Sequence, residues 1–310
     1  MKTWTLDIKP LFDSVGIEKK GLVVMNENAY DFDPKNPEDS WLYPAFLGFN
    51  ELKKSNFKPE SFATIGTGAG VDSIGVFEIF HPKRIYQIDI HPNVPKIAQE
   101  NAQQWVGSKA IVETFLGDLC EPLIKKKIKV DLVYANIPNI PTSQKPLDKK
   151  VSASQFLARE YLDVPTVFQR WYLTHQYLFL KQAKNVVTEK GVVVDAIGIR
   201  VPYNHVLELF TDNGYNVEEL VSIYKIQSEP EDTLEGYAKH EKEAGVEFDF
   251  YDHEKAWLYW QKNLRGKRLA TPELKEALKQ FRISASEAFK RWQKSGKQAG
   301  HICSILKGTL

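Results

Sequence analysis

The 310-residue chain contains almost no sulfur and carries almost no net charge. It has two cysteines, Cys120 and Cys303, and two methionines. Two cysteines in separate predicted elements argue against a disulfide framework, so we expect free, buried thiols in a reducing compartment such as the cytoplasm. The 41 basic and 40 acidic residues leave a net charge of +1. That balance gives no electrostatic footprint for nucleic acid.

Long hydrophobic runs are also absent. No apolar run approaches the ~20 residues of a membrane-spanning helix, and the first residues, Met1 to Asp7, lack the apolar core of a signal peptide. Hydrophobic residues make up 43% of the chain and charged residues 26%, which is typical of a globular protein. The sequence therefore predicts a cytoplasmic protein without membrane or nucleic-acid partners.

What the chain does contain is a regular alternation of short apolar runs and amphipathic segments between residues 61 and 227. The apolar runs predict strands at 61–65, 84–89, 110–116, 130–135, 191–198 and 217–227. The amphipathic segments predict helices at 71–80, 92–106, 164–189 and 204–213. This alternation is typical of an α/β fold in which helices cover both faces of a parallel sheet.

The flanking regions differ in composition from this core. Residues 1–60 predict a mostly helical cap, with a helix at 6–17, a short strand at 21–25 and an aromatic helix near 41–49. Candidates to close over a ligand are Tyr30, Trp41, Tyr43 and Phe46. Residues 228–299 are highly charged and predict a helical insertion. We expect four parts: a cap at 1–60, a core at 61–227, the insertion at 228–299 and a final core strand at 300–310.

A glycine-rich turn follows the first predicted strand of the core. Gly66, Gly68 and Gly70 stand between the apolar run 61–65 and a helix that begins at Val71. Glycine lets the backbone approach a ligand closely and adopt positive φ angles, and a helix start offers free N–H groups. The pattern predicts ligand binding at the carboxyl end of this strand.

Acidic residues follow the next two predicted strands. Asp89 ends its strand about 20 residues after the glycines, where a carboxylate can accept hydrogen bonds from both ribose hydroxyls. Asp118, in Gly117-Asp118-Leu119, is placed to read the amino group of an adenine. Because the carboxyl ends of the strands are where open α/β sheets bind ligands, these residues predict a nucleoside site.

At these residues the chain resembles the class I, Rossmann-like, S-adenosylmethionine-dependent methyltransferases. The resemblance covers about residues 60–227 and the final strand. It implies a seven-stranded, mostly parallel sheet with an antiparallel last strand. It also implies a set of residues that bind S-adenosylmethionine: Gly66, Gly68, Gly70, Asp89, Asp118 and Asn136. One position departs from the family pattern. Thr64 stands where an acid normally helps to hold the methionine amino group, so another residue must do this, or the methionine part lies differently.

The turn Asn136-Ile137-Pro138-Asn139 looks like a degenerate Asn-Pro-Pro-aromatic motif of the same superfamily. In the group that carries this motif, the asparagine side chain and the following carbonyl hold an acceptor nitrogen near the methyl group. The resemblance therefore implies that Asn136 or Asn139 orients an acceptor. Ile137 and Asn139 replace the first proline and the aromatic ring, which removes the ring on which a flat acceptor would stack. The structural alternative is a rigid turn whose asparagines cap backbone groups.

Aromatic residues amount to 12% of the chain. Their faces stabilise cations such as a sulfonium by roughly 0.5–2 kcal/mol each. Five lie nearest the predicted ligand edge, and Tyr177 is taken as a candidate catalytic residue among them: Tyr134, Trp171, Tyr172, Tyr177 and Tyr203. The histidines show no metal-ligand spacing, so we expect no metal site.

The sequence leaves more than one function open. The favoured one is S-adenosylmethionine-dependent methyl transfer to a nitrogen or oxygen of a small molecule in an enclosed pocket. An enzyme of the same fold could instead cyclise S-adenosylmethionine to azetidine-2-carboxylate and methylthioadenosine, as Thr64 and the unusual turn at 136–141 suggest. A third function is non-catalytic nucleoside binding. An NAD-binding protein would share the glycine turn and ribose acid but would give no reason for Asp118. A homodimer is compatible with the sequence.

Overall fold

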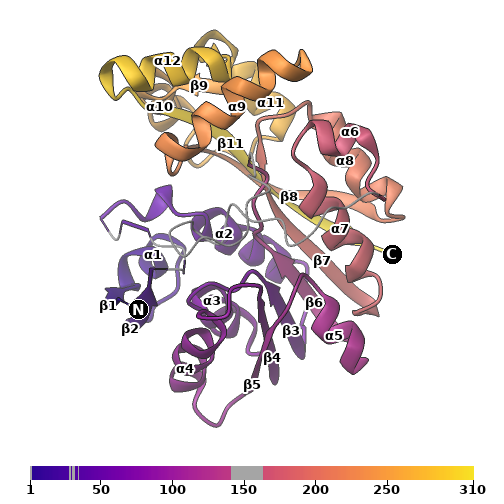
Figure 1. The fold of residues 1–310 in the computed structure, drawn as a ribbon. Coiled ribbons are helices and arrows are strands. Elements are labelled where there is room, and N and C mark those ends of the chain that lie inside the picture. The colour runs from indigo at the N-terminus through magenta and orange to yellow at the C-terminus, as the bar shows by residue number, and fades with distance from the viewer. Residues whose placement is uncertain (1, 28, 30–31, 34, 141–162) are drawn as a thin grey trace.

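The computed structural model describes residues 2–27, 29, 32–33, 35–140 and 163–310. Its centre is one mixed sheet (Figure 1). Seven of its strands follow the order β5 (Ile111–Leu116), β4 (Arg84–Asp89), β3 (Ser61–Ile65), β6 (Val130–Ala135), β7 (Val187–Ile199), β11 (Ala299–Thr309) and β8 (Asn216–Ile226). Neighbours from β5 to β7 are parallel, and β11 is antiparallel to both β7 and β8. This confirms the expected Rossmann-like arrangement with an antiparallel last strand.

The described part of the sheet has nine strands, two more than expected. The additional strands lie in the region that was expected to be helical. β9 (Phe250–Asp252) pairs with β11, and β10 (Arg282–Ile283) pairs with β9. The helices of the same region are α9 (Pro230–Ala244), α10 (His253–Asn263), α11 (Thr271–Leu278) and α12 (Ala285–Ser295). Two- and three-residue strands carry almost no periodicity, which is why the sequence did not reveal them.

Two hydrophobic cores lie on opposite faces of the sheet, because successive strand residues point to opposite sides. Phe62 belongs to one core and Ala63 to the other. The first core contains residues of α2 (Leu42–Lys54), α3 (Val71–Phe80) and α4 (Pro95–Val106). The second contains residues of α5 (Glu121–Lys126), α6 (Thr166–Arg170), α7 (Thr174–Ala183) and α8 (Tyr203–Asp212). The central strands β3, β4 and β6 are therefore buried on both sides, as their near-continuous apolar runs indicated.

The N-terminal region is not mainly helical. The helix expected at 6–17 is present only as the shorter α1 (Lys9–Ser14), and Leu6 and Asp7 belong to β1 (Thr3–Asp7). β1 pairs antiparallel with β2 (Leu22–Asn26) over five residues, from Thr3 opposite Asn26 to Asp7 opposite Leu22. Pairing with a strand 15 or more residues away outweighs the local helical spacing at Leu6 and Asp7, so the predicted bounds of this helix were wrong. The strand expected at 21–25 and the helix expected near 41–49 are present as β2 and α2.

The long helix expected at 164–189 was also wrong. Its residues form α6 and α7, and the chain enters β7 at Val187. Tyr172 separates the two helices with a left-handed φ of 56°. A non-glycine residue in this conformation interrupts the run of α-helical dihedral angles, although the apolar spacing continues across it. In the part of the chain that the structure describes, no helix is both long enough and apolar enough to cross a membrane.

Candidate functional site

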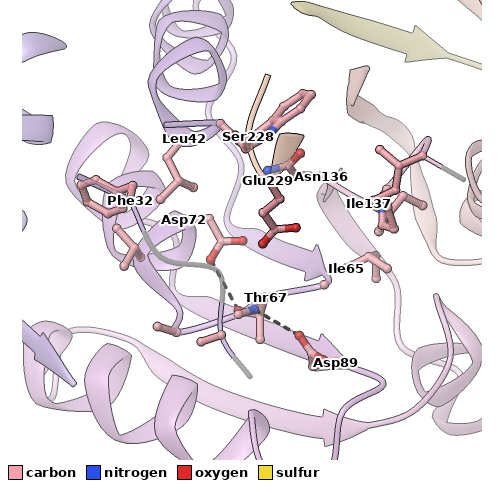
Figure 2. A pocket seen from close by; sticks show the side chains of 18 of the residues that line it. Phe32, Leu42, Ile65, Thr67, Asp72, Asp89, Asn136, Ile137, Ser228 and Glu229 are labelled. Atoms are coloured by element: carbon pink, nitrogen blue, oxygen red, sulfur yellow. Dashed lines mark hydrogen bonds between the residues drawn. The ribbon is translucent and has the colours of Figure 1, made fainter. Parts of the chain in front are cut away.

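A cavity of about 600 Å³ lies at the carboxyl ends of β3, β4 and β6 (Figure 2). Cavities of this size are typical of small-molecule and cofactor sites. Its walls come from the N-terminal region, the glycine turn, the strand ends and the start of α9. Representative lining residues from these segments are Phe32, Trp41, Leu42, Gly66, Gly68, Asp72, Asp89, Asp118, Asn136, Arg200 and Glu229. The turn, the two acids and Asn136, expected to share one edge of the sheet, all line this one cavity.

The three glycines of the turn have positive φ angles of 75°, 53° and 81° at Gly66, Gly68 and Gly70. Gly66 and Gly68 line the cavity, whereas Gly70 does not. Gly70 caps α3, where a Cβ atom would lie 2.8 Å from the Gln87 side chain and 2.9 Å from the Ala98 carbonyl oxygen. The first two glycines therefore shape the ligand surface, and the third lets α3 pack against its neighbours.

Asp89 is almost fully buried at the end of β4, with 5% of its surface exposed. Its carboxylate accepts hydrogen bonds from the backbone N–H groups of Gly68, at 3.1 Å, and His91, at 2.9 Å. Burial raises the pKa of this carboxyl to about 6, although the backbone hydrogen bonds favour the ionised form. A carboxylate has about four acceptor positions, so Asp89 can still accept hydrogen bonds from ligand hydroxyls.

The two asparagines of the turn after β6 have different surroundings. Asn139 is buried: its side-chain amide donates to the Gly198 carbonyl at 2.7 Å and accepts from Arg200 at 3.1 Å. Tyr237 donates a hydrogen bond to the backbone carbonyl of Asn139. The Asn136 side chain makes no hydrogen bond to another described residue and lines the cavity. Asn136 can therefore contact a ligand without rearrangement, whereas the Asn139 side chain already holds the protein's own backbone.

The carbonyl groups within this turn are also engaged. Gln176 on α7 donates to the Ile137 carbonyl at 2.9 Å, and the His175 ring lies 3.2 Å from the Pro138 carbonyl. The carbonyl after Asn136, which the motif resemblance assigned to an acceptor, thus already has a protein partner. Because a carbonyl oxygen has two lone pairs, it retains one further acceptor position.

Of the aromatic candidates nearest the ligand edge, only Tyr134 lines the cavity. Its hydroxyl is buried without a hydrogen-bond partner in the described structure. Tyr177 lies outside the cavity lining, and its ring stacks on Phe168 with a centroid separation of 5.2 Å. Among the candidate lid residues Trp41 lines the cavity, Tyr43 and Phe46 do not, and Tyr30 lies outside the described residues. We therefore assign no role to Tyr177.

Asp72 is a lining residue that the sequence analysis missed. It is the second residue of α3, and only 4% of its surface is exposed. The Thr64 hydroxyl donates a hydrogen bond to one carboxylate oxygen, and the Ser73 backbone N–H donates to the other at 2.7 Å. Burial raises the pKa of Asp72 to about 6. The available signal was an acid in the first helical turn after the glycines, where the helix dipole favours negative charge.

Arg200, which lines the cavity, and Lys225, which does not, form a second buried group, and both are fully inaccessible to solvent. Arg200 donates to the Gln227 side chain at 2.8 Å as well as to Asn139. The Lys225 ammonium lies 4.5 Å from the Trp41 ring centre, and burial lowers its pKa to about 7. Neither cation forms an ion pair within the described chain. Nothing in the sequence around these residues indicated such a pair.

No known family model matches the chain. A methionine S-methyltransferase of Zea mays is 23% identical over 239 residues, which are 69% of this chain and 21% of that protein. A release factor glutamine methyltransferase of Moorella thermoacetica is 36% identical over 86 residues, which are 28% of this chain and 29% of that protein. Both relatives are methyltransferases, so the chain is similar to S-adenosylmethionine-dependent methyltransferases, in agreement with the class I resemblance of its motifs. Its alignments span about a fifth and under a third of these two relatives' lengths.

Among solved structures, the ribosomal protein L11 methylase of Lactobacillus delbrueckii has a TM-score of 0.40 and 16% identity. The similarity covers 58% of this chain and 72% of that one. The methyltransferases that match the chain in sequence support S-adenosylmethionine as its cofactor.

The cavity has the charge that S-adenosylmethionine requires. The cofactor carries an ammonium and a sulfonium, and the described lining residues include seven carboxylates but only one permanent cation, Arg200. The carboxylates belong to Glu27, Asp33, Asp39, Asp72, Asp89, Asp118 and Glu229. Asp89 and Asp118 lie at the neighbouring ends of β4 and β5, where the adenosine would bind across the strand ends. The residues present therefore fit the cofactor.

Proposed function

We propose that this chain transfers the methyl group of S-adenosylmethionine to a nitrogen or oxygen of a small molecule. The observation that carries the proposal is the open Asn136 side chain, which lines the same cavity as the glycine turn and Asp89. The cofactor would supply an electrophilic methyl group on a sulfonium sulfur. The Asn136 amide would accept a hydrogen bond from the acceptor N–H or O–H and hold its lone pair in line with that group.

The walls that the N-terminal region and the start of α9 add to the cavity support a small acceptor. Phe32, Trp41 and Leu42 line it on the side of the N-terminal region, and Glu229 and Thr233 line it at the start of α9 (Figure 2). We propose that residues 1–60 and 228–299 act as the parts that enclose the acceptor over the core at 61–227 and 300–310. Apolar side chains on one side would limit the access of water to the sulfonium.

The relatives differ in what their names say they methylate. One acts on methionine and the other on a glutamine of a release factor. The small-molecule assignment therefore depends on this chain's own cavity. The absence of an aromatic ring at Asn139 supports it, because that ring is where a flat amide would stack.

The test measures by mass spectrometry the two compounds that can form from the cofactor, S-adenosylhomocysteine and methylthioadenosine. The protein is incubated with S-adenosylmethionine alone, with pools of small amines, alcohols and amino acids, and with a release factor protein. We expect S-adenosylhomocysteine only with a small-molecule pool, and at least a tenfold lower rate for Asn136→Ala. Methylthioadenosine without an acceptor would establish cyclisation instead, and methylation of the release factor alone would establish a protein substrate. Cofactor binding without turnover in any pool would indicate a binding protein.

A further inference from the structure

Asp72 is a buried carboxyl that lines the cavity and that the described protein leaves without a cation. Its carboxylate accepts hydrogen bonds from hydroxyls and one backbone N–H, and it forms no ion pair. An isolated charge in a protein interior is strongly unfavourable unless a partner is present. An asparagine could fill the same space without this penalty. An acidic side chain buried at the cavity wall without a protein cation therefore points to a cation that arrives with a ligand.

The position of Asp72 identifies which end of the ligand this cation belongs to. Asp89 and Asp118 mark the β4 and β5 side of the cavity. Asp72 contacts Thr64 on β3, which pairs directly with Tyr134 on β6. Figure 2 shows Asp72 and Asp89 on different sides of Thr67. With adenosine across β4 and β5, the amino-acid end of the cofactor extends over β3 towards β6, which brings it to Asp72.

We propose that Asp72 binds the α-ammonium group of S-adenosylmethionine. This assignment rests on the proposed function only in that the chain must bind this cofactor. The carboxylate takes over the charge that is missing at Thr64, and the Thr64 hydroxyl orients it by a hydrogen bond. In the family pattern one acid at the end of the strand holds the ammonium group. In this chain Thr64 occupies that place on β3, and Asp72 on α3 supplies the carboxylate.

The structural alternative is an acid that only stabilises the first turn of α3. The Ser73 N–H and the Thr67 hydroxyl, at 3.4 Å, are contacts that such an acid would make. This alternative predicts that removing the charge affects the fold and affects all ligands equally. Ammonium binding predicts a loss restricted to ligands that carry the amino group.

The test measures calorimetric affinities of the full chain for S-adenosylhomocysteine and for its deaminated analogue, which keeps the adenosine, thioether and carboxylate. We expect Asp72→Asn to weaken S-adenosylhomocysteine binding at least tenfold, as expected for a buried charge-assisted hydrogen bond, and to change the affinity for the analogue less than threefold. Asp131→Asn is the matched control. Asp131 also accepts hydrogen bonds from backbone N–H groups and from two hydroxyls, but at the start of β6, at the opposite end of the sheet.

Two results would overturn the assignment: equal weakening of both ligands, or no weakening of S-adenosylhomocysteine. Failure of the wild-type protein to bind either ligand would overturn the proposed function as well, so the two failures are distinguishable. Thermal unfolding checks that each variant folds, and Asp72→Ser, which keeps a hydroxyl next to Thr64, replaces Asp72→Asn if that variant does not.

Discussion

The Arg200 guanidinium donates a hydrogen bond of 3.1 Å to the side-chain oxygen of Asn139, and both side chains are buried. This bond, with the one from the Asn139 amide to the Gly198 carbonyl, ties the turn after β6 to the end of β7. Asn136, three residues earlier, has no such partner in the described protein. The two asparagines of this short motif therefore differ: the Asn139 side chain is bonded within the protein, whereas the Asn136 side chain faces the cavity.

The separation predicts opposite phenotypes for the two asparagines. Asn139→Ala leaves the Gly198 carbonyl and an Arg200 N–H group unpaired, and we expect a loss of about 2–4 kcal/mol in the free energy of unfolding. Asn136→Ala removes no internal hydrogen bond, so the free energy of unfolding should change by less than about 1 kcal/mol while turnover falls. Urea denaturation gives the first quantity. Similar destabilisation by both variants would contradict the distinction.

The buried carboxylates predict opposite effects of pH on stability and on cofactor binding. Burial raises the pKa of both Asp72 and Asp89 to about 6, above the unfolded value of about 4. Between pH 4 and 6 the folded state therefore binds more protons, and the stability that these groups contribute decreases as the pH rises through this range. Cofactor binding needs the ionised forms and should weaken below pH 6.

This prediction is measured on the ligand-free protein and on its complex. The difference in melting temperature between the wild type and Asp72→Asn should narrow as the pH falls from 7 to 5, while S-adenosylhomocysteine affinity of the wild type declines over the same interval. An affinity that is independent of pH between 5 and 7 would show that neither carboxylate contacts the ligand in its charged form.

Lys225 is predicted to destabilise the folded protein at neutral pH. Its pKa is lowered to about 7 by burial and by the nearby Arg200, so the unfolded state binds more protons between pH 7 and about 10. The penalty is therefore complete below pH 7 and decreases as the pH rises. We expect Lys225→Met to raise the melting temperature at pH 6–7, with a smaller gain near pH 10. Scanning calorimetry at both pH values tests this. A larger gain in melting temperature at pH 10 than at pH 6–7 would contradict the prediction that the charged form of Lys225 destabilises the fold.

Gly48 is predicted to be essential for the packing of α2 on the sheet. Alanine normally stabilises a helix interior by about 1 kcal/mol relative to glycine. At Gly48 an added Cβ would lie 2.6 Å from the Cγ2 atom of Ile305 on β11. We expect Gly48→Ala to destabilise the protein by about 1–3 kcal/mol in urea denaturation.

The matched background for this variant is Ile305→Ala, which removes the clashing methyl group. There the same glycine substitution should be neutral or stabilising, and the double-mutant cycle isolates the contact. An equal loss of stability in both backgrounds would show that the clash is not the cause.

Local sequence patterns predicted those features that depend on a single residue or on one short run of residues. Apolar runs predicted the core strands, and the glycine turn followed by Asp89 and Asp118 predicted a nucleoside site at their carboxyl ends. The same local reasoning set the wrong bounds for the helix at 6–17, whose first residues pair in β1, and it missed the break at the left-handed Tyr172 within 164–189. It also missed β9 and β10, which exist because longer strands offer them an edge.

The sequence by itself determined the alternating architecture and predicted which residues meet at the carboxyl ends of the strands, because these depend on periodicity and on residues close together in the chain. Only the tertiary structure decided which asparagine is open and which acid lies next to Thr64. Asn139 is held by Arg200, 61 positions away, and Asp72 approaches Thr64 only after the glycine turn reverses the chain. The role of a buried charge or hydrogen-bonding group depends on the partners that folding brings next to it. These partners are not neighbours in the sequence, so spacing along the chain does not predict them.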